Sequence, residues 1–194
     1  GVSESNYSDH TGLNLSWRGT FFNLAIRAFH NDPELSSMDA LIGRRLSDID
    51  AKGLGSRVGF MLSLASKLPK TSVEGRFKVI MSPLVAGHLY SIISNSWMNA
   101  YNVLRNLSPL SVKDVGNKVA SESLTLIDSS ADPSRVGSEP ADLEGNQTSN
   151  VTLIKNGVLS SFITNNRTAN KLGVKSTGNA ARGWLTPSIR HLYI

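Results

Sequence analysis

The side chains that could do chemistry in this chain are histidines and carboxylates, because the sequence contains no cysteine. Without thiols there is no disulfide, no thiolate metal ligand and no thiol nucleophile. No two of the four histidines are three or four residues apart, the spacing that places two imidazoles on one helix face to hold a metal. His88 lies in a predicted apolar helix, and we interpret it as a core residue rather than a ligand.

Carboxylates are dense only between residues 128 and 144. Such a group could bind a cation or supply a general acid and base. Its spacing does not match the alternating ligand positions of a calcium loop, and the segment is rich in Ser, Gly, Pro and Asp. We therefore predict a long, solvated surface loop. The acids in it are Asp128, Asp132, Glu139, Asp142 and Glu144.

Two glycine-rich segments invite a functional interpretation. Residues 53–59 (GLGSRVG) differ in spacing from a dinucleotide-binding loop, and a polar stretch precedes them where a buried strand would be needed. We predict the start of a helix there, with Arg57–Leu68 as its apolar-striped body. Residues 173–180 (GVKSTGNA) predict a tight glycine loop that follows a short helix.

A β-hairpin is predicted immediately before that short helix. Two apolar segments flank Asn156-Gly157, and this pair suits the positive φ angles of a two-residue hairpin turn. Hairpin, helix and glycine loop are therefore expected to follow one another along the chain.

The remaining pattern predicts an α+β fold. Apolar and polar residues alternate between Leu13 and Phe29, which is typical of two or three half-buried strands. Ser36-Ser37-Met38-Asp39 has the composition of a helix start, and residues 76–81 (RFKVIM) predict a strand. Pro83 opens the longest predicted helix. Its apolar residues surround the axis as far as Leu104, so we expect this helix to be buried.

The net charge of +5 is unevenly distributed. Residues 122–144 hold six acids and one base, whereas residues 145–194 hold six bases and no acid. One interpretation is a basic surface for nucleic acid. The other is that the basic half faces the acidic segment or an acidic partner subunit. We favour the second because the bases are spread singly among apolar residues.

Length and composition are those of a globular protein. A chain of 194 residues can bury a core in one or two domains, and 40% hydrophobic with 18% charged residues does not suggest disorder. No apolar run approaches the roughly 20 residues of a membrane span. The first residues lack the basic start and apolar stretch of a secretion signal. We therefore expect a cytoplasmic location and no membrane partner.

Several short motifs follow one another at useful spacing between about Asn6 and Ile194. They are VIMSPLVAGHL (79–89), DLEG (142–145) with Thr148, LIKNGVL (153–159), RTA (167–169), LG (172–173) and STGNA (176–180) with Arg182. Any one motif is weak, but the ordered set resembles the TldD/PmbA family of peptidases, also known as modulators of DNA gyrase.

This resemblance implies a two-domain organisation. Residues 1–70 would form the C-terminal part of an N-terminal α/β domain. Residues 71–194 would form the first part of a β-rich, peptidase-like C-terminal domain with a long buried helix. Family members begin earlier and continue further, so the chain resembles a fragment of such a protein.

In TldD-like members, a His-Glu-x-x-x-His motif on the long helix holds zinc, and its Glu can serve as general base. The matching positions here are Gly87, His88 and Ile92, so both histidines and the glutamate of the motif are missing. Gly-His-Leu at this place resembles the PmbA (TldE-like) branch, which lacks the motif. The resemblance therefore carries over no metal ligand and no catalytic residue.

What the resemblance implies is a non-catalytic partner subunit in the proteolysis of small or unfolded peptides. We expect no cofactor in this chain, zinc in a TldD-like partner, and a dimer with such a subunit or with a second copy. Alternatives are an interaction protein acting as a DNA gyrase modulator or nucleic-acid binder, and a hydrolase with an unrecognised site around His88. The candidate substrate-binding residues are Asn156, Gly157, Ser176, Thr177, Gly178 and Asn179.

Overall fold

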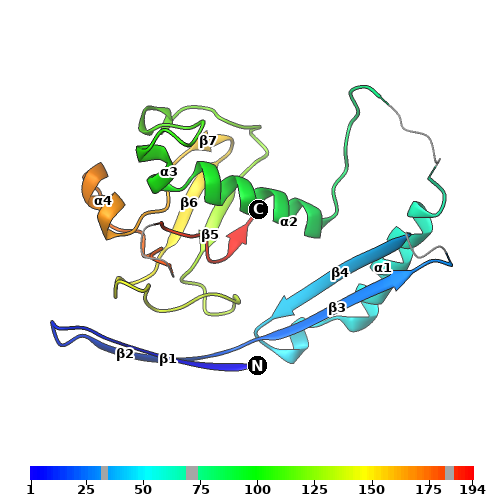
Figure 1. Ribbon diagram of the computed structural model, residues 1–194, viewed down its shortest axis with the longest axis horizontal. Helices are drawn as coiled ribbons and strands as arrows, with labels where there is room; N and C mark the ends of the chain where they lie inside the picture. Colours follow the sequence, from blue (N-terminus) through cyan, green and yellow to red (C-terminus); the bar gives the residue numbers. More distant parts are fainter. Residues whose placement is uncertain (32–34, 69–73, 182–185) are drawn as a thin grey trace. The chain divides into compact units, whose positions relative to one another are not determined.

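The computed structural model describes residues 1–31, 35–68, 74–181 and 186–194 (Figure 1). They form two compact units, unit 1 (Gly1–Val2 and Thr20–Ala86) and unit 2 (Ser3–Gly19 and Gly87–Ile194). Helices and sheets are mixed, which confirms the α+β class. Arg182 and the predicted domain boundary at residues 70–71 lie outside the described residues. The elements are β1 (Val2–Ser8), β2 (Asn14–Thr20), β3 (Phe22–Phe29), β4 (Ser36–Gly43), η1 (Leu46–Asp48), α1 (Ala51–Ala65), α2 (Pro83–Trp97), α3 (Ala100–Leu104), η2 (Val112–Asp114), β5 (Leu126–Ser129), β6 (Asn150–Lys155), β7 (Val158–Leu159), α4 (Asn166–Leu172) and β8 (Leu192–Tyr193).

Unit 1 is built on the antiparallel pair β3 and β4. The ladder runs over eight residues, from Phe22 opposite Gly43 to Phe29 opposite Ser36. The strands predicted between Leu13 and Phe29 are confirmed as β2 and β3. The helix predicted to start at Ser36 is wrong, because this segment completes the β3 ladder and cross-strand pairing outweighs a weak capping signal.

Helix α1 packs on this pair through a narrow stripe. The carboxylate of Asp50 caps the helix by accepting from the Gly53 amide at 2.9 Å. The helix therefore begins at Ala51 rather than at Arg57, and the 53–59 glycines lie within its turns. Leu54 and Val58, one turn apart, are its buried residues. Gly53, Gly55 and Gly59 are thus part of a helix and do not form a nucleotide-binding loop.

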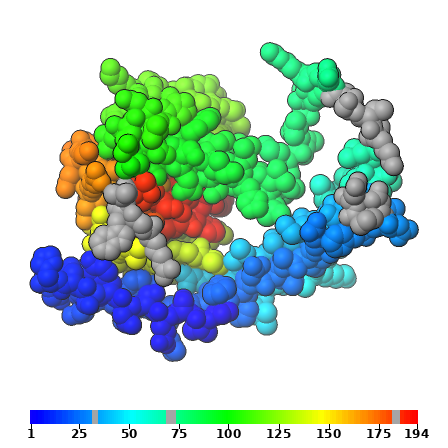
Figure 2. All heavy atoms as spheres, viewed as in Figure 1, coloured from blue at the N-terminus to red at the C-terminus, as the bar shows by residue number. Residues whose placement is uncertain are grey.

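Residues 76–81 were predicted as a strand, and this prediction is wrong. The segment has no regular structure, and Val79 and Ile80 are 73% and 99% exposed. Figure 2 shows it as an extended run of teal-green atoms. No strand of the described residues lies beside it to complete a ladder, so β-forming side chains alone do not make a strand here.

Helix α2 begins at Pro83 as predicted, but it ends at Trp97. Asn99 then caps the separate helix α3 by accepting from the Tyr101 amide. The prediction of one long buried helix needs a second correction, because Ser94 is the only buried residue of α2. Its apolar surface is covered on too few sides by other described residues. No helix in the described part of the chain is long and apolar enough to cross a membrane.

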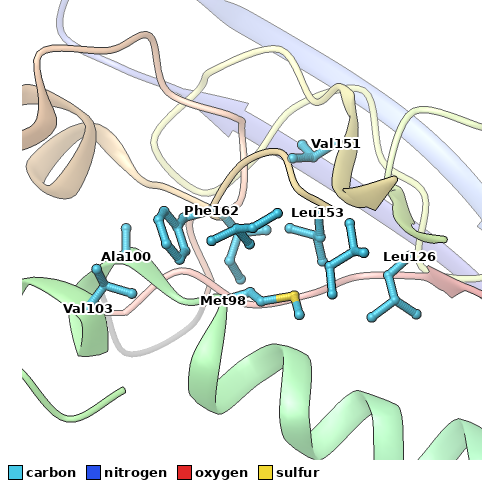
Figure 3. Close-up of a cluster of buried hydrophobic side chains, with 10 residues drawn as sticks. Met98, Ala100, Val103, Leu126, Val151, Leu153 and Phe162 are labelled. Atoms are coloured by element: carbon cyan, nitrogen blue, oxygen red, sulfur yellow. The ribbon is translucent and has the colours of Figure 1, made fainter. Parts of the chain in front are cut away.

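The core of unit 2 lies between α3 and a four-stranded antiparallel sheet of order β7-β6-β5-β8. Figure 3 shows side chains from the sheet, from the start of α3 and from the segment around Phe162 gathered into one cluster. Burying each large aliphatic side chain contributes about 1.5–3 kcal/mol. The cluster comprises Met98, Ala100, Val103, Leu126, Val151, Leu153, Ile154, Leu159, Phe162 and Ile163.

The predicted hairpin is confirmed as β6 and β7, which pair with Lys155 opposite Val158. The turn residues Asn156 and Gly157 have φ angles of 49° and 79°. Both angles are left-handed, as the turn requires.

Replacement of Gly157 by alanine is expected to destabilise the chain severely. A Cβ at this position would lie 2.6 Å from the carbonyl oxygen of Ala120 and 2.7 Å from that of Ser121. We expect Gly157→Ala to lower the free energy of unfolding in urea by about 3 kcal/mol. The control is Gly116→Ala, where φ is 89° but the space is open, and the loss should be about 1 kcal/mol. Equal losses would contradict the clash.

The ion pair between β4 and α1 should make unit 1 sensitive to acid. Arg57 Nε donates to Asp39 Oδ2 at 2.8 Å, and this hydrogen bond lowers the pKa of Asp39 below its ordinary 3.8. A lowered pKa stabilises the folded state above that ordinary value and ceases to do so as the pH falls through the folded value. Asp39→Asn should cost up to about 1 kcal/mol of unfolding free energy at pH 7 and less with each step below pH ~3.8. A cost that does not change between pH 7 and pH 2.5 would argue against the ion pair.

Candidate functional site

The positions predicted to correspond to the family's zinc motif lie on α2 and offer one imidazole. Gly87 has no side chain, Ile92 is 66% exposed, and His88 is exposed as well. The interpretation of His88 as a core residue is therefore wrong, since no described residue covers that face of the helix. No group of three or more His, Cys, Asp or Glu side chains that could hold a metal occurs among the described residues. Gly87, His88 and Ile92 would supply at most one ligand to a metal ion.

The carboxylate-rich segment is not a solvated loop throughout, because Asp128 and Asp142 are buried. Asp128 accepts four hydrogen bonds. Its Oδ2 accepts from the Ser130 hydroxyl at 2.9 Å and from the Asn179 amide at 2.6 Å. Its Oδ1 accepts from the backbone amides of Arg190 at 3.2 Å and His191 at 2.9 Å. A buried carboxylate is stabilised only when its lone pairs are satisfied in this way.

Asp142 makes a second buried connection. Its Oδ1 accepts from the backbone amides of Glu144 and Asn146, both at 2.9 Å, and so closes its own loop. Its Oδ2 accepts from the backbone amide of Ala180 at 3.0 Å. The DLEG motif is thereby attached to the end of the glycine loop. Both buried acids hold backbone segments in place.

Three sets of contacts hold the glycine loop (residues 173–180) in place. Thr164 and Thr177 bond reciprocally, each backbone amide donating to the other hydroxyl at 2.8 and 2.9 Å. Gly178 lies against the backbone of Gln147, where a Cβ would come within 2.6 Å of its carbonyl oxygen. The side chain of Asn179 is fully buried and donates to Asp128. The predicted tight loop is confirmed, and these contacts hold it against the segments around Thr164, Gln147 and Asp128.

The short helix predicted after the hairpin is confirmed as α4. Asn165 caps its first turn by accepting from the Thr168 amide at 3.0 Å, and Gly173 ends it with a left-handed φ of 66°. Arg167 and Lys171 are exposed on this helix, which Figure 2 shows in orange on the surface of unit 2.

Among the described residues, the two sets of predicted substrate-binding residues have different hydrogen-bond partners. Asn156 bonds with Thr125 at the hairpin turn, whereas Ser176–Asn179 contact the segments around Thr164 and Asp128. Of the six, Gly157, Gly178 and Asn179 are buried.

Comparison with known proteins identifies the family. The model of the PmbA/TldA metallopeptidase C-terminal domain matches residues 74–194. The chain belongs to the TldD/PmbA family. The resemblance seen in its ordered motifs is thereby confirmed.

Individual TldD/PmbA relatives cover most of this chain. A metalloprotease of Methanothermobacter thermautotrophicus is 36% identical over 135 residues, 68% of this chain and 28% of that protein. The crystal structure of a proposed DNA gyrase modulator from Thermotoga maritima has a TM-score of 0.70 and 26% identity, covering 96% of this chain and 43% of that one. TldE from Thermococcus kodakarensis has a TM-score of 0.72 at 22% identity, covering 98% and 44%, and this likeness shows the fold alone. The chain spans less than half the length of each relative.

Removing the charge of Asp128 tests whether its four hydrogen bonds stabilise unit 2. In Asp128→Asn an NH2 group replaces one carboxylate oxygen. Its N–H groups would then face the N–H or O–H donors that this oxygen accepted from. We expect the free energy of unfolding to fall by about 2–4 kcal/mol. The control is Asp132→Asn in the same segment, where the Ser134 hydroxyl lowers the carboxyl pKa at a more exposed site. That change should cost less than about 1 kcal/mol, and equal costs would speak against a special role for Asp128.

Proposed function

We propose that this chain is a PmbA/TldE-like partner subunit, without catalytic residues of its own, in the proteolysis of small or unfolded peptides. A TldD-like subunit would supply the zinc ion and the general base, and this chain would complete the assembly. A homodimer is the alternative arrangement.

The proposal rests on the side chains that α2 offers at positions 87, 88 and 92. Family membership supports a link to peptidases, yet the helix offers Gly87, His88 and Ile92 where a zinc site needs two imidazoles and a carboxylate. The buried acids elsewhere are engaged in backbone bonds. A subunit whose buried acids hold the fold together, and whose helix α2 does not offer a zinc-ligand set, fits a supporting role.

Substrate contacts are proposed for those predicted residues that reach the surface. Asn156 is exposed, and Ser176 and Thr177 are partly exposed. The fully buried Asn179 is better explained by its bond to Asp128.

The proposal is tested by metal content and peptide hydrolysis, measured first on the full chain alone and then with a TldD-like subunit from the same cell. The chain alone should contain far less than one zinc ion and cleave no labelled unfolded peptide. The mixture should cleave the peptide at least several-fold faster than the TldD-like subunit alone. One zinc ion bound per isolated chain would sink the proposal.

His88→Ala is the matched control variant for this test. Because His88 is exposed on α2, its removal should change the hydrolysis rate of the mixture by less than about twofold and the free energy of unfolding by less than about 0.5 kcal/mol. Loss of hydrolysis with unchanged folding would instead indicate a site around His88.

A second candidate function, a gyrase-linked or nucleic-acid-binding role, is favoured by the basic residues on and after α4. Arg167, Lys171 and Lys175 are exposed, and no acid follows Glu144 in the sequence. DNA binding whose affinity falls with salt by a slope of several charges would support this candidate.

A further inference from the structure

The turn between β6 and β7 is Asn156-Gly157, the only Asn-Gly pair in the sequence. Asparagine before glycine is the pair in which an asparagine side chain most readily loses its amide, because glycine has no side chain to hinder attack by its own backbone nitrogen. Asn156 is exposed to solvent, whereas Gly157 is buried. The two reacting groups therefore lie in different surroundings.

Deamidation of such a pair consumes only water and needs no enzyme. The Gly157 nitrogen gives up its proton to hydroxide and attacks Cγ of Asn156. The new C–N bond closes a succinimide ring, while the bond from Cγ to Nδ2 breaks and ammonia leaves with a proton taken from water. Water then opens the ring. Opening at Cγ gives aspartate, and opening at the backbone carbonyl carbon gives isoaspartate, in which the main chain runs through Cγ.

The side chain that would be attacked is open to this reaction. The Thr125 hydroxyl donates a long hydrogen bond to Asn156 Oδ1 at 3.4 Å, and the Asn156 backbone amide donates to the same hydroxyl at 3.2 Å. A donor on Oδ1 draws electrons from Cγ and makes it a better target for a nucleophile. Neither contact engages the Nδ2 group that leaves.

The attacking nitrogen, in contrast, is held by its neighbours. Gly157 donates its backbone N–H to the Leu124 carbonyl at 2.9 Å, and this bond is lost if the proton is removed. The Gly157 carbonyl accepts from the backbone amides of Val119 and Ala120 at 2.8 and 3.1 Å. Bonds on both sides of the residue also fix its peptide planes. Residues 119–124 therefore keep the nitrogen protonated and restrain it from turning toward Cγ.

Residues 119–124 are anchored by a few side chains. Val119, Ala120 and Leu124 are partly buried and pack against the core cluster of unit 2. The segment lies directly on the turn, since a Cβ on Gly157 would come within 2.6 Å of the Ala120 carbonyl oxygen. It belongs to no helix or strand. Opening of a segment held in this way costs less free energy than unfolding of the whole unit.

We propose that Asn156 is a deamidation site that the fold keeps unreactive, and that it reacts when residues 119–124 detach from the hairpin turn. Opening and closing are fast relative to the chemistry, so the rate follows the fraction of opened molecules. Isoaspartate lengthens the main chain by one carbon before Gly157, which can then no longer meet its partners in residues 119–124. The modification thereby makes a local opening permanent. This inference does not depend on the proposed function.

The test is mass spectrometry of peptides from the full chain after incubation in mildly alkaline buffer. Deamidation is read as the mass gained when OH replaces NH2, and isoaspartate is separated from aspartate by chromatography. Asn156 in the folded chain should react about tenfold or more slowly than in the same chain unfolded in urea. Equal rates in the two states would overturn the proposal.

Leu124→Ala loosens the segment without changing either reacting residue. The loss of its anchoring side chain should raise the deamidation rate of the folded chain by about threefold or more. The matched control is Leu172→Ala, because Leu172 is also partly buried and packs against the same cluster but lies on α4. Its rate should stay within about twofold of the wild-type rate. Equal acceleration by both variants would show that global stability alone sets the rate, and would overturn the inference.

Hydrogen exchange of the Gly157 amide keeps the proposal falsifiable if Leu124→Ala does not fold. This exchange in the wild-type chain requires the same bond to Leu124 to break. As urea is added below the unfolding transition, the exchange rate and the deamidation rate of Asn156 should rise by the same factor. Exchange that accelerates while deamidation stays constant would contradict the proposal.

Discussion

The buried carboxylate of Asp128 is the interaction on which the arrangement of unit 2 depends. It joins β5 to the glycine loop through Asn179 and to the C-terminal segment through the amides of Arg190 and His191. The carboxylate itself is fully buried, so losing one of these bonds leaves a polar group without a water molecule to replace it. The sheet, the glycine loop and the C-terminal segment are therefore linked through one side chain.

Sequence patterns predicted the parts of this fold that short-range chemistry decides. Asn156-Gly157 specifies its hairpin because few other residues adopt two left-handed φ angles, and α4 is bounded by its own cap and by Gly173. The Asp128–Asn179 bond could not be predicted in this way. It joins residues 51 positions apart, and nothing local distinguishes a carboxylate that bonds inside from one that faces water.

Errors in the predicted elements have the same cause. Ser36–Gly43 has a weak helix signal, but its register with β3 satisfies eight residues of backbone at once. Residues 76–81 have a strong strand signal and no partner strand in the described part of the chain. For α2, an all-round apolar sequence predicted burial, which also needs surfaces on every side of the helix. Pairing and coverage are properties of the whole molecule, and short windows of sequence do not contain them.

The exposed run from Phe77 to Met81 has a practical consequence for handling this chain. Its apolar side chains are β-forming, it pairs with no strand of the described residues, and its nearby charges are Lys78 within the run and Arg76 just before it. Segments of this kind join edge to edge between molecules and nucleate aggregates. Arg76 and Lys78 therefore oppose such pairing by mutual repulsion, and multivalent anions that screen these two charges would favour association of the segment.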